Sequence, residues 1–163
     1  MIIYHGSNLT VSEPRLVPQN RFLDFGYGFY TTTNKDQATS FAMKVTKRRR
    51  EGVPTVSVYE FDEKKAFSEC TLLRFGSANE AWLDFVSENR SGNYDGELYD
   101  FIFGPVADDD VYATFALYTA GVFTKEQTLE ALKVKKLYDQ LVLSTEKALS
   151  YLKFIGTVPE EEF

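Results

Sequence analysis

The chain has 163 residues, of which 18 are basic and 24 acidic, so its formal net charge is −6. A length between about 100 and 200 residues is typical of one domain, and a hydrophobic fraction of 44% excludes a disordered chain. The acidic balance argues against a dedicated nucleic-acid-binding module. No uncharged apolar run approaches the roughly 18 residues of a membrane span. We therefore expect one domain over residues 1–163 and no membrane partner.

Cysteine and histidine usage narrows the chemistry further. Cys70 is the only cysteine and His5 the only histidine, so the sequence predicts neither an internal disulfide nor a zinc cluster. The first ten residues lack the basic segment and long apolar run of a secretory signal. We expect a protein of the reducing cytoplasm that binds no metal.

The first third of the chain predicts a strand, a loop, a strand and a helix. Residues 2–5 form a short apolar strand, and two prolines argue against regular structure in the loop that follows. Within residues 22–32 the first half is a glycine-punctuated turn and the second half a strand. Asn34 and Gln37 have the spacing of a capping box that opens a helix. The residues expected on its buried face are Ala38, Phe41, Ala42 and Val45.

The rest of the chain mixes strands and helices without strict alternation, which favours the α+β class. We expect strands at residues 55–61, 71–75, 99–106 and 139–143. Capping patterns open three helices, at Ser77 with Glu80, at one of the aspartates 108–110, and at Thr124 with Gln127. The buried face of the first of these helices consists of Trp82, Phe85, Val86 and Asn89. A last helix is expected from Thr145 to Leu152, followed by a frayed acidic tail at residues 155–163.

Several well-known catalytic motifs are missing from the sequence. It contains no phosphate-cradling GxxxxGK[ST], no GxSxG elbow and no HExxH zinc helix. Gly26 and Gly28 form a pair without the third glycine that dinucleotide-binding folds use. One basic patch, Lys44 with residues 47–50, is interpreted as the solvated end of a helix rather than a nucleic-acid contact.

Two short segments carry the candidate site residues. His5 ends the first strand in Tyr4-His5-Gly6-Ser7, where the small residue lets a ligand approach the backbone. Tyr30 follows the glycine pair in the segment GYGFYTTT. Taken alone, a single histidine is more often structural, and the second segment also fits a bulge with core aromatic residues.

In this order, however, YHGS and DFGYGFYTTTNKDQATSFA resemble the ADP-ribosyltransferase superfamily. The closest likeness is to its histidine–tyrosine–glutamate branch, which includes diphtheria-toxin-like and poly(ADP-ribose)-polymerase-like enzymes. The chain is also similar to an uncharacterised bacterial family of small stand-alone members within it. That likeness involves the segments 82–90, 104–109 and 139–149 and covers residues 1 to about 155.

The resemblance implies a split β-sheet core with flanking helices and NAD as the substrate. His5 would bind the NAD ribose, Tyr30 would line the nicotinamide pocket, and Gln140 aligns with the glutamate of the branch. Further residues expected at the NAD site are Gly6, Ser7, Gly28, Phe29, Thr31 and Arg90. Asp108 or Asp109 are alternative sources of a carboxylate, although both equally fit a helix N-cap.

The chemistry of NAD cleavage is consistent with these residue types. Breaking the nicotinamide–ribose bond builds positive charge on the ribose, so a site needs ribose ligands, an aromatic wall and an acceptor-rich group. A histidine, a tyrosine and an amide can supply these without a metal. Arg90 fits either a pyrophosphate contact or an ordinary cationic helix end, and Asp24 either orders the loop before Tyr30 or makes an Asx-turn.

A glutamine in place of the glutamate leaves three functional hypotheses open. The first is an ADP-ribosyltransferase acting on a macromolecular acceptor, either protein or nucleic acid. Family resemblance suggests a bacterial toxin with an antitoxin or immunity protein as partner. The second is an NAD glycohydrolase, in which water is the acceptor. The third is an inactive domain that binds NAD or a protein, because Gln140 lacks the full charge of a carboxylate.

Overall fold

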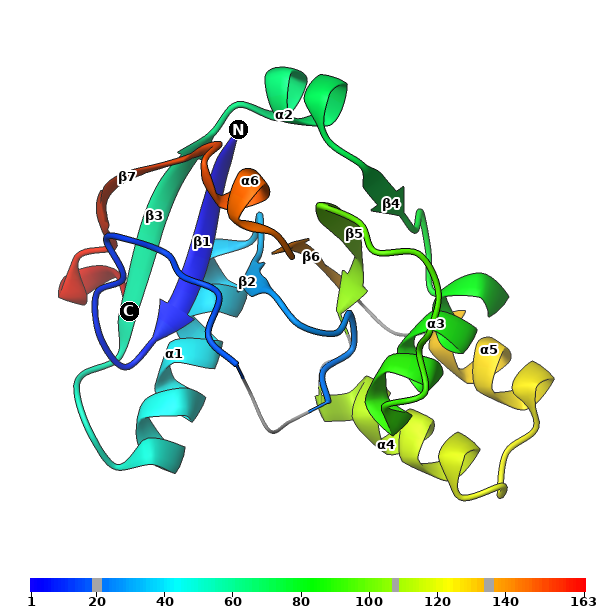
Figure 1. The fold of residues 1–163 in the computed structure, drawn as a ribbon. Coiled ribbons are helices and arrows are strands. Elements are labelled where there is room, and N and C mark those ends of the chain that lie inside the picture. Colours follow the sequence, from blue (N-terminus) through cyan, green and yellow to red (C-terminus); the bar gives the residue numbers. More distant parts are fainter. Residues whose placement is uncertain (19–21, 107–108, 134–136) are drawn as a thin grey trace.

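A computed structural model describes the chain except for residues 19–21, 107–108 and 134–136. The described residues form six α-helices, one short 3-10 helix and seven strands in two sheets (Figure 1). The strands are β1 (Ile2–Ser7), β2 (Phe29–Thr31), β3 (Thr55–Phe61), β4 (Leu72–Arg74), β5 (Phe101–Val106), β6 (Tyr138–Leu143) and β7 (Leu152–Thr157). The helices are α1 (Lys35–Arg49), α2 (Glu63–Glu69), α3 (Glu80–Ser91), α4 (Asp109–Thr119), α5 (Lys125–Lys133), α6 (Glu146–Leu149) and the 3-10 helix Glu160–Glu162.

The two sheets differ in size and pairing. The first has the order β1-β3-β7 and is antiparallel throughout. The second has the order β2-β6-β5-β4, and only β4 and β5 run parallel in it. Strands and helices therefore mix in both halves of the chain, which confirms the expected α+β class.

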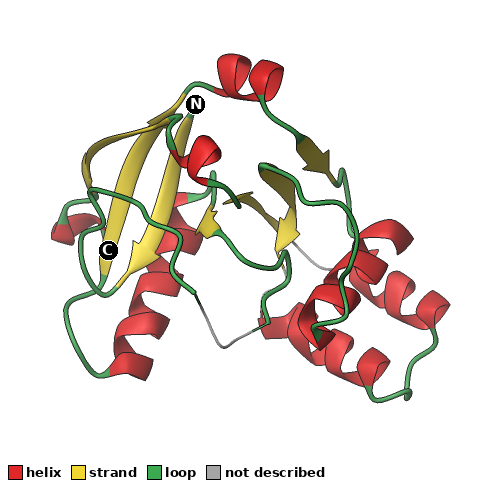
Figure 2. Cartoon of the chain, viewed as in Figure 1, coloured by secondary structure: helices red, strands yellow, loops and turns green. Residues whose placement is uncertain are grey.

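Figure 2 shows how the helices and strands are arranged, and three apolar clusters hold them together. Between the two sheets lies a cluster to which β1 contributes Ile3 and β2 contributes Phe29. The helix α1 packs through Ala38 and Ala42 on the other side of the three-stranded sheet. The helices α3, α4 and α5 cover the second sheet around Trp82. The point where β1 meets β2 consequently lies at the junction of the two sheets.

Several local predictions are confirmed by backbone geometry. β3 spans Thr55–Phe61 as expected. The Asn34 side chain accepts a hydrogen bond from the Gln37 amide, 2.8 Å away, and so caps α1. Thr124 and Gln127 form a reciprocal capping box, with bonds of 3.2 and 2.9 Å. All four residues expected on the inner face of α3 are buried.

The predicted inner face of α1 was wrong at Phe41, whose side chain is 50% exposed. The helix contacts β1 through its alanines: a Cβ added to Gly6 would lie 2.1 Å from the Ala38 carbonyl oxygen. An approach this close leaves no room for a phenylalanine ring between helix and strand. Small residues, rather than the periodicity of large ones, therefore define this contact.

Two helix starts also differ from expectation. The residue that caps α3 is Asn79, whose side chain accepts from the Trp82 amide at 3.0 Å, and not Ser77. α2 was not predicted, because its seven residues are too few to show an amphipathic period. Its capping residue is Asp62, which accepts from the Lys65 amide at 3.2 Å.

The C-terminal segment was predicted wrongly in two respects. α6 ends at Leu149, and residues up to Thr157 form β7 instead of a longer helix and the start of a frayed tail. The reason is tertiary, because β7 pairs with the edge of β3 that β1 leaves open. Beyond the strand, Glu162 forms a salt bridge of 2.7 Å with Lys35.

In the part of the chain that the structure describes, no helix has the length and apolar character needed to cross a membrane.

Candidate functional site

The two sheets meet at one backbone bridge and then separate. Tyr4 and Thr32 exchange hydrogen bonds of 2.9 and 3.0 Å between their backbone groups. In a strand, the N–H and C=O groups of alternate residues point to the same side, so those of Gly6 face the side of β2, as those of Tyr4 do. Nothing in the described ranges bonds to them. Gly6 is thus buried, and its backbone N–H and C=O both lack a hydrogen-bond partner among the described residues.

The His5 side chain replaces the next backbone hydrogen bond of this interrupted strand pairing. Its Nδ1 lies 2.7 Å from the Tyr30 carbonyl oxygen. A carbonyl can only accept, so Nδ1 carries the hydrogen, which makes Nε2 an acceptor in the neutral ring. Burial lowers the pKa of His5 below 6.5. The hydrogen bond to Tyr30 acts to raise this pKa, and the Arg49 charge makes a smaller contribution that lowers it. The imidazole stacks on Phe29 at 4.3 Å between centroids.

Tyr30 ties the loop before β2 to the strand. Its hydroxyl accepts from the Phe25 amide at 3.1 Å and donates to the Gly26 carbonyl at 2.7 Å. Burial raises the pKa of this phenol far above its ordinary value, so it stays neutral. The ring packs against the cluster around Trp82.

Gln140 lies on β6, next to β2, and is only 4% exposed. Its Nε2 is 3.4 Å from the Pro105 carbonyl oxygen, which also accepts from the Trp82 indole at 2.9 Å. Tyr30 stands opposite Val142, so side-chain alternation puts Gln140 and Tyr30 on the same face of the sheet. His5, by contrast, rests on Phe29, which points to the opposite face. The structure therefore makes the three strands neighbours but divides the three side chains between two faces.

The small and apolar residues expected at the NAD site have packing roles. A Cβ on Gly28 would lie 2.5 Å from a methyl carbon of Val142, so β6 by itself requires glycine there. Thr31 is buried and donates to the Leu141 carbonyl at 2.7 Å. Ser7 lies at the buried end of β1, where its hydroxyl is 3.5 Å from the Asn8 side-chain oxygen.

Arg90 and Asp24, which the sequence presented as separate candidates, bind each other. The Arg90 Nε is 2.5 Å from the Asp24 carboxylate. The guanidinium also lies over the rings of Tyr112 and Phe115, at 4.8 and 4.6 Å. This arrangement joins α3, α4 and the loop before β2, close to the Tyr30 hydroxyl. For the predicted phosphate contact, Arg90 would have to use the guanidinium N–H groups that this ion pair does not occupy.

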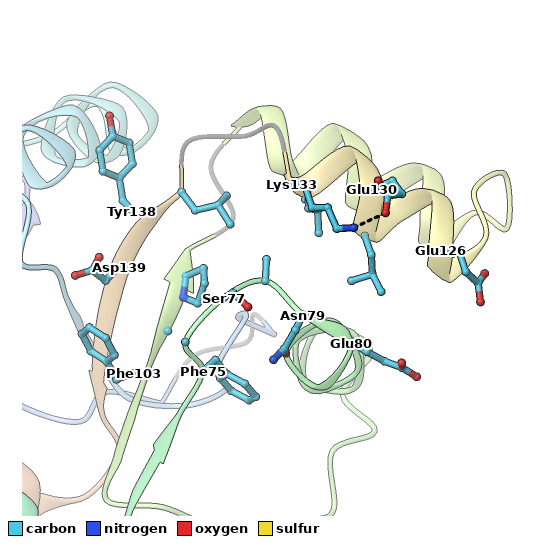
Figure 3. Close-up of a pocket in the computed structure, with 17 residues that line it drawn as sticks. Phe75, Ser77, Asn79, Glu80, Phe103, Glu126, Glu130, Lys133, Tyr138 and Asp139 are labelled. Carbon is cyan, nitrogen blue, oxygen red and sulfur yellow. Dashed lines mark hydrogen bonds and ion pairs between the residues drawn. The ribbon is translucent and has the colours of Figure 1, made fainter.

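A cavity lies away from these residues, between β5, β6, α3 and α5 (Figure 3). It measures about 830 Å³ and contains none of His5, Tyr30 and Gln140. Its walls include Phe75, Ser77 and Asp139. A second cavity of about 240 Å³ adjoins the loop that Tyr30 holds, with Gly26 and Gly28 in its wall.

Asp139 directly precedes Gln140 in β6, so its carboxylate points to the opposite face of the sheet, and sequence reasoning did not single it out. It accepts from the Thr33 hydroxyl at 2.7 Å. Its position at the start of a strand, directly before Gln140, was the available signal. Asp108 lies outside the described residues, and Asp109 is the first residue of α4, without a described side chain. No group of three His, Cys, Asp or Glu residues within the described ranges could hold a metal ion.

Comparison with known proteins gives a single match. No curated protein and no solved structure matches the chain. A family model described as "Protein of unknown function (DUF3990)" matches residues 1–154. Because this match covers nearly the whole sequence, the chain belongs to that family.

Proposed function

We propose that this protein is an NAD-dependent ADP-ribosyltransferase built on a split β-sheet of the ADP-ribosyltransferase type. The observation that carries the proposal is the parting of β1 and β2 after the bridge between Tyr4 and Thr32. It leaves the backbone groups of Gly6 unpaired beside His5, whose Nδ1 is bonded to the Tyr30 carbonyl. His5 and Tyr30 also belong to the two segments that carry the sequence resemblance.

The unpaired groups match the nicotinamide end of NAD. A carboxamide has one acceptor oxygen and an NH₂ donor, so it can bond to the Gly6 N–H and C=O in the way the missing strand pairing would. The Nε2 of His5 can then accept a hydrogen bond from a ribose hydroxyl, because Nδ1 is already committed to Tyr30.

In the proposed reaction, the bond between ribose C1′ and the nicotinamide nitrogen breaks, and its electron pair leaves with nicotinamide. A nucleophile on the acceptor forms the new bond to C1′ and gives up its proton. His5 and Gly6 would orient the two parts of NAD across the bond that breaks. Gln140 can offer hydrogen bonds but no negative charge, so stabilisation of the cationic transition state by a carboxylate would have to come from another residue.

The test is release of nicotinamide from NAD by the purified protein, with cell extract supplied as a source of acceptor. We expect His5→Ala to lower the rate by about 100-fold or more, as expected for the loss of a transition-state contact. Ser77→Ala, in the wall of the large cavity, should leave the rate unchanged. Absence of release by the wild-type protein, or an equal rate in His5→Ala, would contradict the proposal.

Gln140 specifically favours a second candidate function, which is NAD binding without transfer. Calorimetry would then detect NAD binding while nicotinamide release stays at background. An NAD glycohydrolase would instead release free ADP-ribose in the absence of any acceptor, so product analysis separates it from a transferase. A role as a cytoplasmic toxin with an antitoxin partner predicts that expression harms a bacterial host and that His5→Ala abolishes the harm.

A further inference from the structure

The C-terminal end of α1 concentrates positive charge in a chain of opposite net charge. Five of the 18 basic residues lie within residues 44–50, in a protein of net charge −6. The helix ends next to the last residues of β1, because the Arg49 guanidinium donates to the Asn8 side-chain oxygen at 2.8 Å. One member of this basic group is thereby fixed beside the strand that carries His5 and Gly6.

Asn8 holds Arg49 in a defined position. The Asn8 side chain is buried, with 4% exposure, and its Nδ2 donates to the Glu51 carbonyl at 3.0 Å. Its own carbonyl accepts from the Val53 amide at 2.9 Å. Gly52 closes this turn with a φ of 77°, and a Cβ there would lie 2.0 Å from the Asn8 carbonyl oxygen. The local backbone is therefore built around Asn8, which orients the guanidinium.

The charge of Arg49 is not neutralised by a neighbour. Its only hydrogen bond to a described residue is the one to Asn8, and none of the salt bridges formed within the described ranges includes it. A guanidinium has five N–H donors, so most of them stay available. The Arg49 charge also acts to lower the pKa of His5, although burial is the larger cause.

We propose that Arg49 binds the diphosphate of the dinucleotide substrate. This inference rests on the proposed function, which puts the nicotinamide ribose at His5. In NAD the diphosphate is attached to C5′ of that ribose, so a ribose bound at His5 brings the diphosphate close to this residue. An arginine fork matches phosphate oxygens in a bidentate geometry. Arg49 lies at this end of β1 without a salt bridge to any described residue, and its bond to Asn8 already fixes its position.

The experiment measures binding of two probes by calorimetry, ADP-ribose with a diphosphate and nicotinamide without one. The variants are Arg49→Met and the control Lys47→Met, which removes the same charge from the same helix end. We expect Arg49→Met to weaken ADP-ribose binding about tenfold or more, the typical effect of losing a charge-assisted bond. Its nicotinamide affinity should stay within about twofold of wild type, and Lys47→Met should change ADP-ribose affinity by less than about threefold.

Arg49→Lys keeps the charge without the fork and should give an intermediate loss. Thermal unfolding of each variant shows whether a loss of binding follows a loss of folding. Unchanged ADP-ribose affinity in Arg49→Met would overturn the inference, and so would equal losses in the Arg49 and Lys47 variants, which indicate a diffuse electrostatic effect. A single-stranded oligonucleotide that binds more tightly than ADP-ribose would overturn it too, because the phosphates recognised would then be those of nucleic acid.

Failure of the proposed function and failure of the Arg49 assignment give different results. If the wild-type protein releases no nicotinamide but binds ADP-ribose and inorganic pyrophosphate in an Arg49-dependent way, the diphosphate site stands and the transferase proposal fails. If it releases nicotinamide and Arg49→Met binds ADP-ribose like wild type, the transferase proposal stands and the assignment of Arg49 fails.

Discussion

Two regions of this molecule are candidates for ligand binding. One offers a large cavity, and the other offers unpaired hydrogen-bonding groups. The cavity between α3, α5 and the ends of β5 and β6 measures about 830 Å³. The junction of β1 and β2 lines neither described cavity except at Gly28, yet it has the unpaired backbone of Gly6 and the Nε2 of His5. Space is plentiful in the first region, whereas hydrogen-bonding groups in need of a partner are concentrated in the second.

The large cavity and the unpaired hydrogen-bonding groups thus lie in different places in this molecule. Most polar groups near the large cavity already have partners: Asp139 accepts from Thr33, and Glu130 pairs with Lys133. At the strand junction, backbone groups that a continuous sheet would satisfy are left for a ligand. We therefore expect substitutions at the strand junction to destabilise the fold more than substitutions in the cavity wall.

The largest effect on stability is expected from two matched glycine substitutions. In Gly6→Ala the new Cβ would lie 2.1 Å from the Ala38 carbonyl oxygen, so α1 must move away from β1. We expect a loss of roughly 3 kcal/mol in the free energy of unfolding, the upper end of overpacking effects. In Gly76→Ala, in the cavity wall, the Cβ meets nothing within 4 Å, and the change should stay within about 0.5 kcal/mol. Urea unfolding measures both, and equal losses would remove the contrast between the regions.

A slightly smaller effect is expected from Tyr30→Phe. The substitution leaves the Phe25 amide and the Gly26 carbonyl without the hydroxyl that now bonds to both. Such buried groups cost about 1–3 kcal/mol when they lose a partner, so we expect a fall of that size in the free energy of unfolding. Tyr27→Phe, three residues earlier on an exposed side chain, should change it by less than about 0.5 kcal/mol. A neutral Tyr30→Phe would show that the hydroxyl does not hold the loop.

Gln140→Glu tests whether the third predicted residue can take the role of a carboxylate. The new side chain would face the Pro105 carbonyl oxygen at a site that is 4% exposed, which raises the pKa of the introduced carboxyl. We expect a loss of about 1–3 kcal/mol at pH 7. The loss should disappear as the pH falls toward about 4.3, the ordinary pKa of a glutamate, because the carboxyl is then protonated in both states.

Gln127→Glu is the control for this swap, since an exposed glutamate at that position can still accept from the Thr124 amide as Gln127 does. A Gln140→Glu protein that is as stable as wild type at pH 7, and that releases nicotinamide faster, would show that this side chain reaches the ribose. The result would contradict the orientation toward Pro105.

The sequence predicted local structure well where a side chain decides it alone. The cap at Asn34 and the box at Thr124 depend on residues three positions apart, and the inner face of α3 on residues within about two turns; all three are present. Prediction failed where a distant strand or helix decides. β7 exists because β3 offers it an edge, and Phe41 is exposed because α1 meets β1 through alanine and glycine.

For the candidate site, the sequence identified three strands that become neighbours, but not the faces to which their side chains point. Strand alternation depends on register, and the register of β2 against β6 is a long-range property. The pairing of Asp24 with Arg90 was hidden for the same reason, because the two residues are 66 positions apart.

The smallest expected effect concerns pH. Burial in the folded protein lowers the pKa of His5 below 6.5, with the Arg49 charge acting in the same direction, so the unfolded chain takes up a proton at a higher pH than the folded one. Stability from neutral His5 is therefore complete above about pH 6.5 and is lost as the pH falls through the lowered pKa. By pH 5.5 the loss is at most about 1.4 kcal/mol. Because the sequence contains one histidine, urea unfolding of wild type and His5→Asn at pH 7.5 and 5.5 isolates this contribution. The asparagine amide can still donate to the Tyr30 carbonyl but cannot titrate. An equal pH dependence in the two proteins would mean that the imidazole takes up a proton as readily in the folded protein as in the unfolded chain, so that His5 is not held as a neutral acceptor at the strand junction.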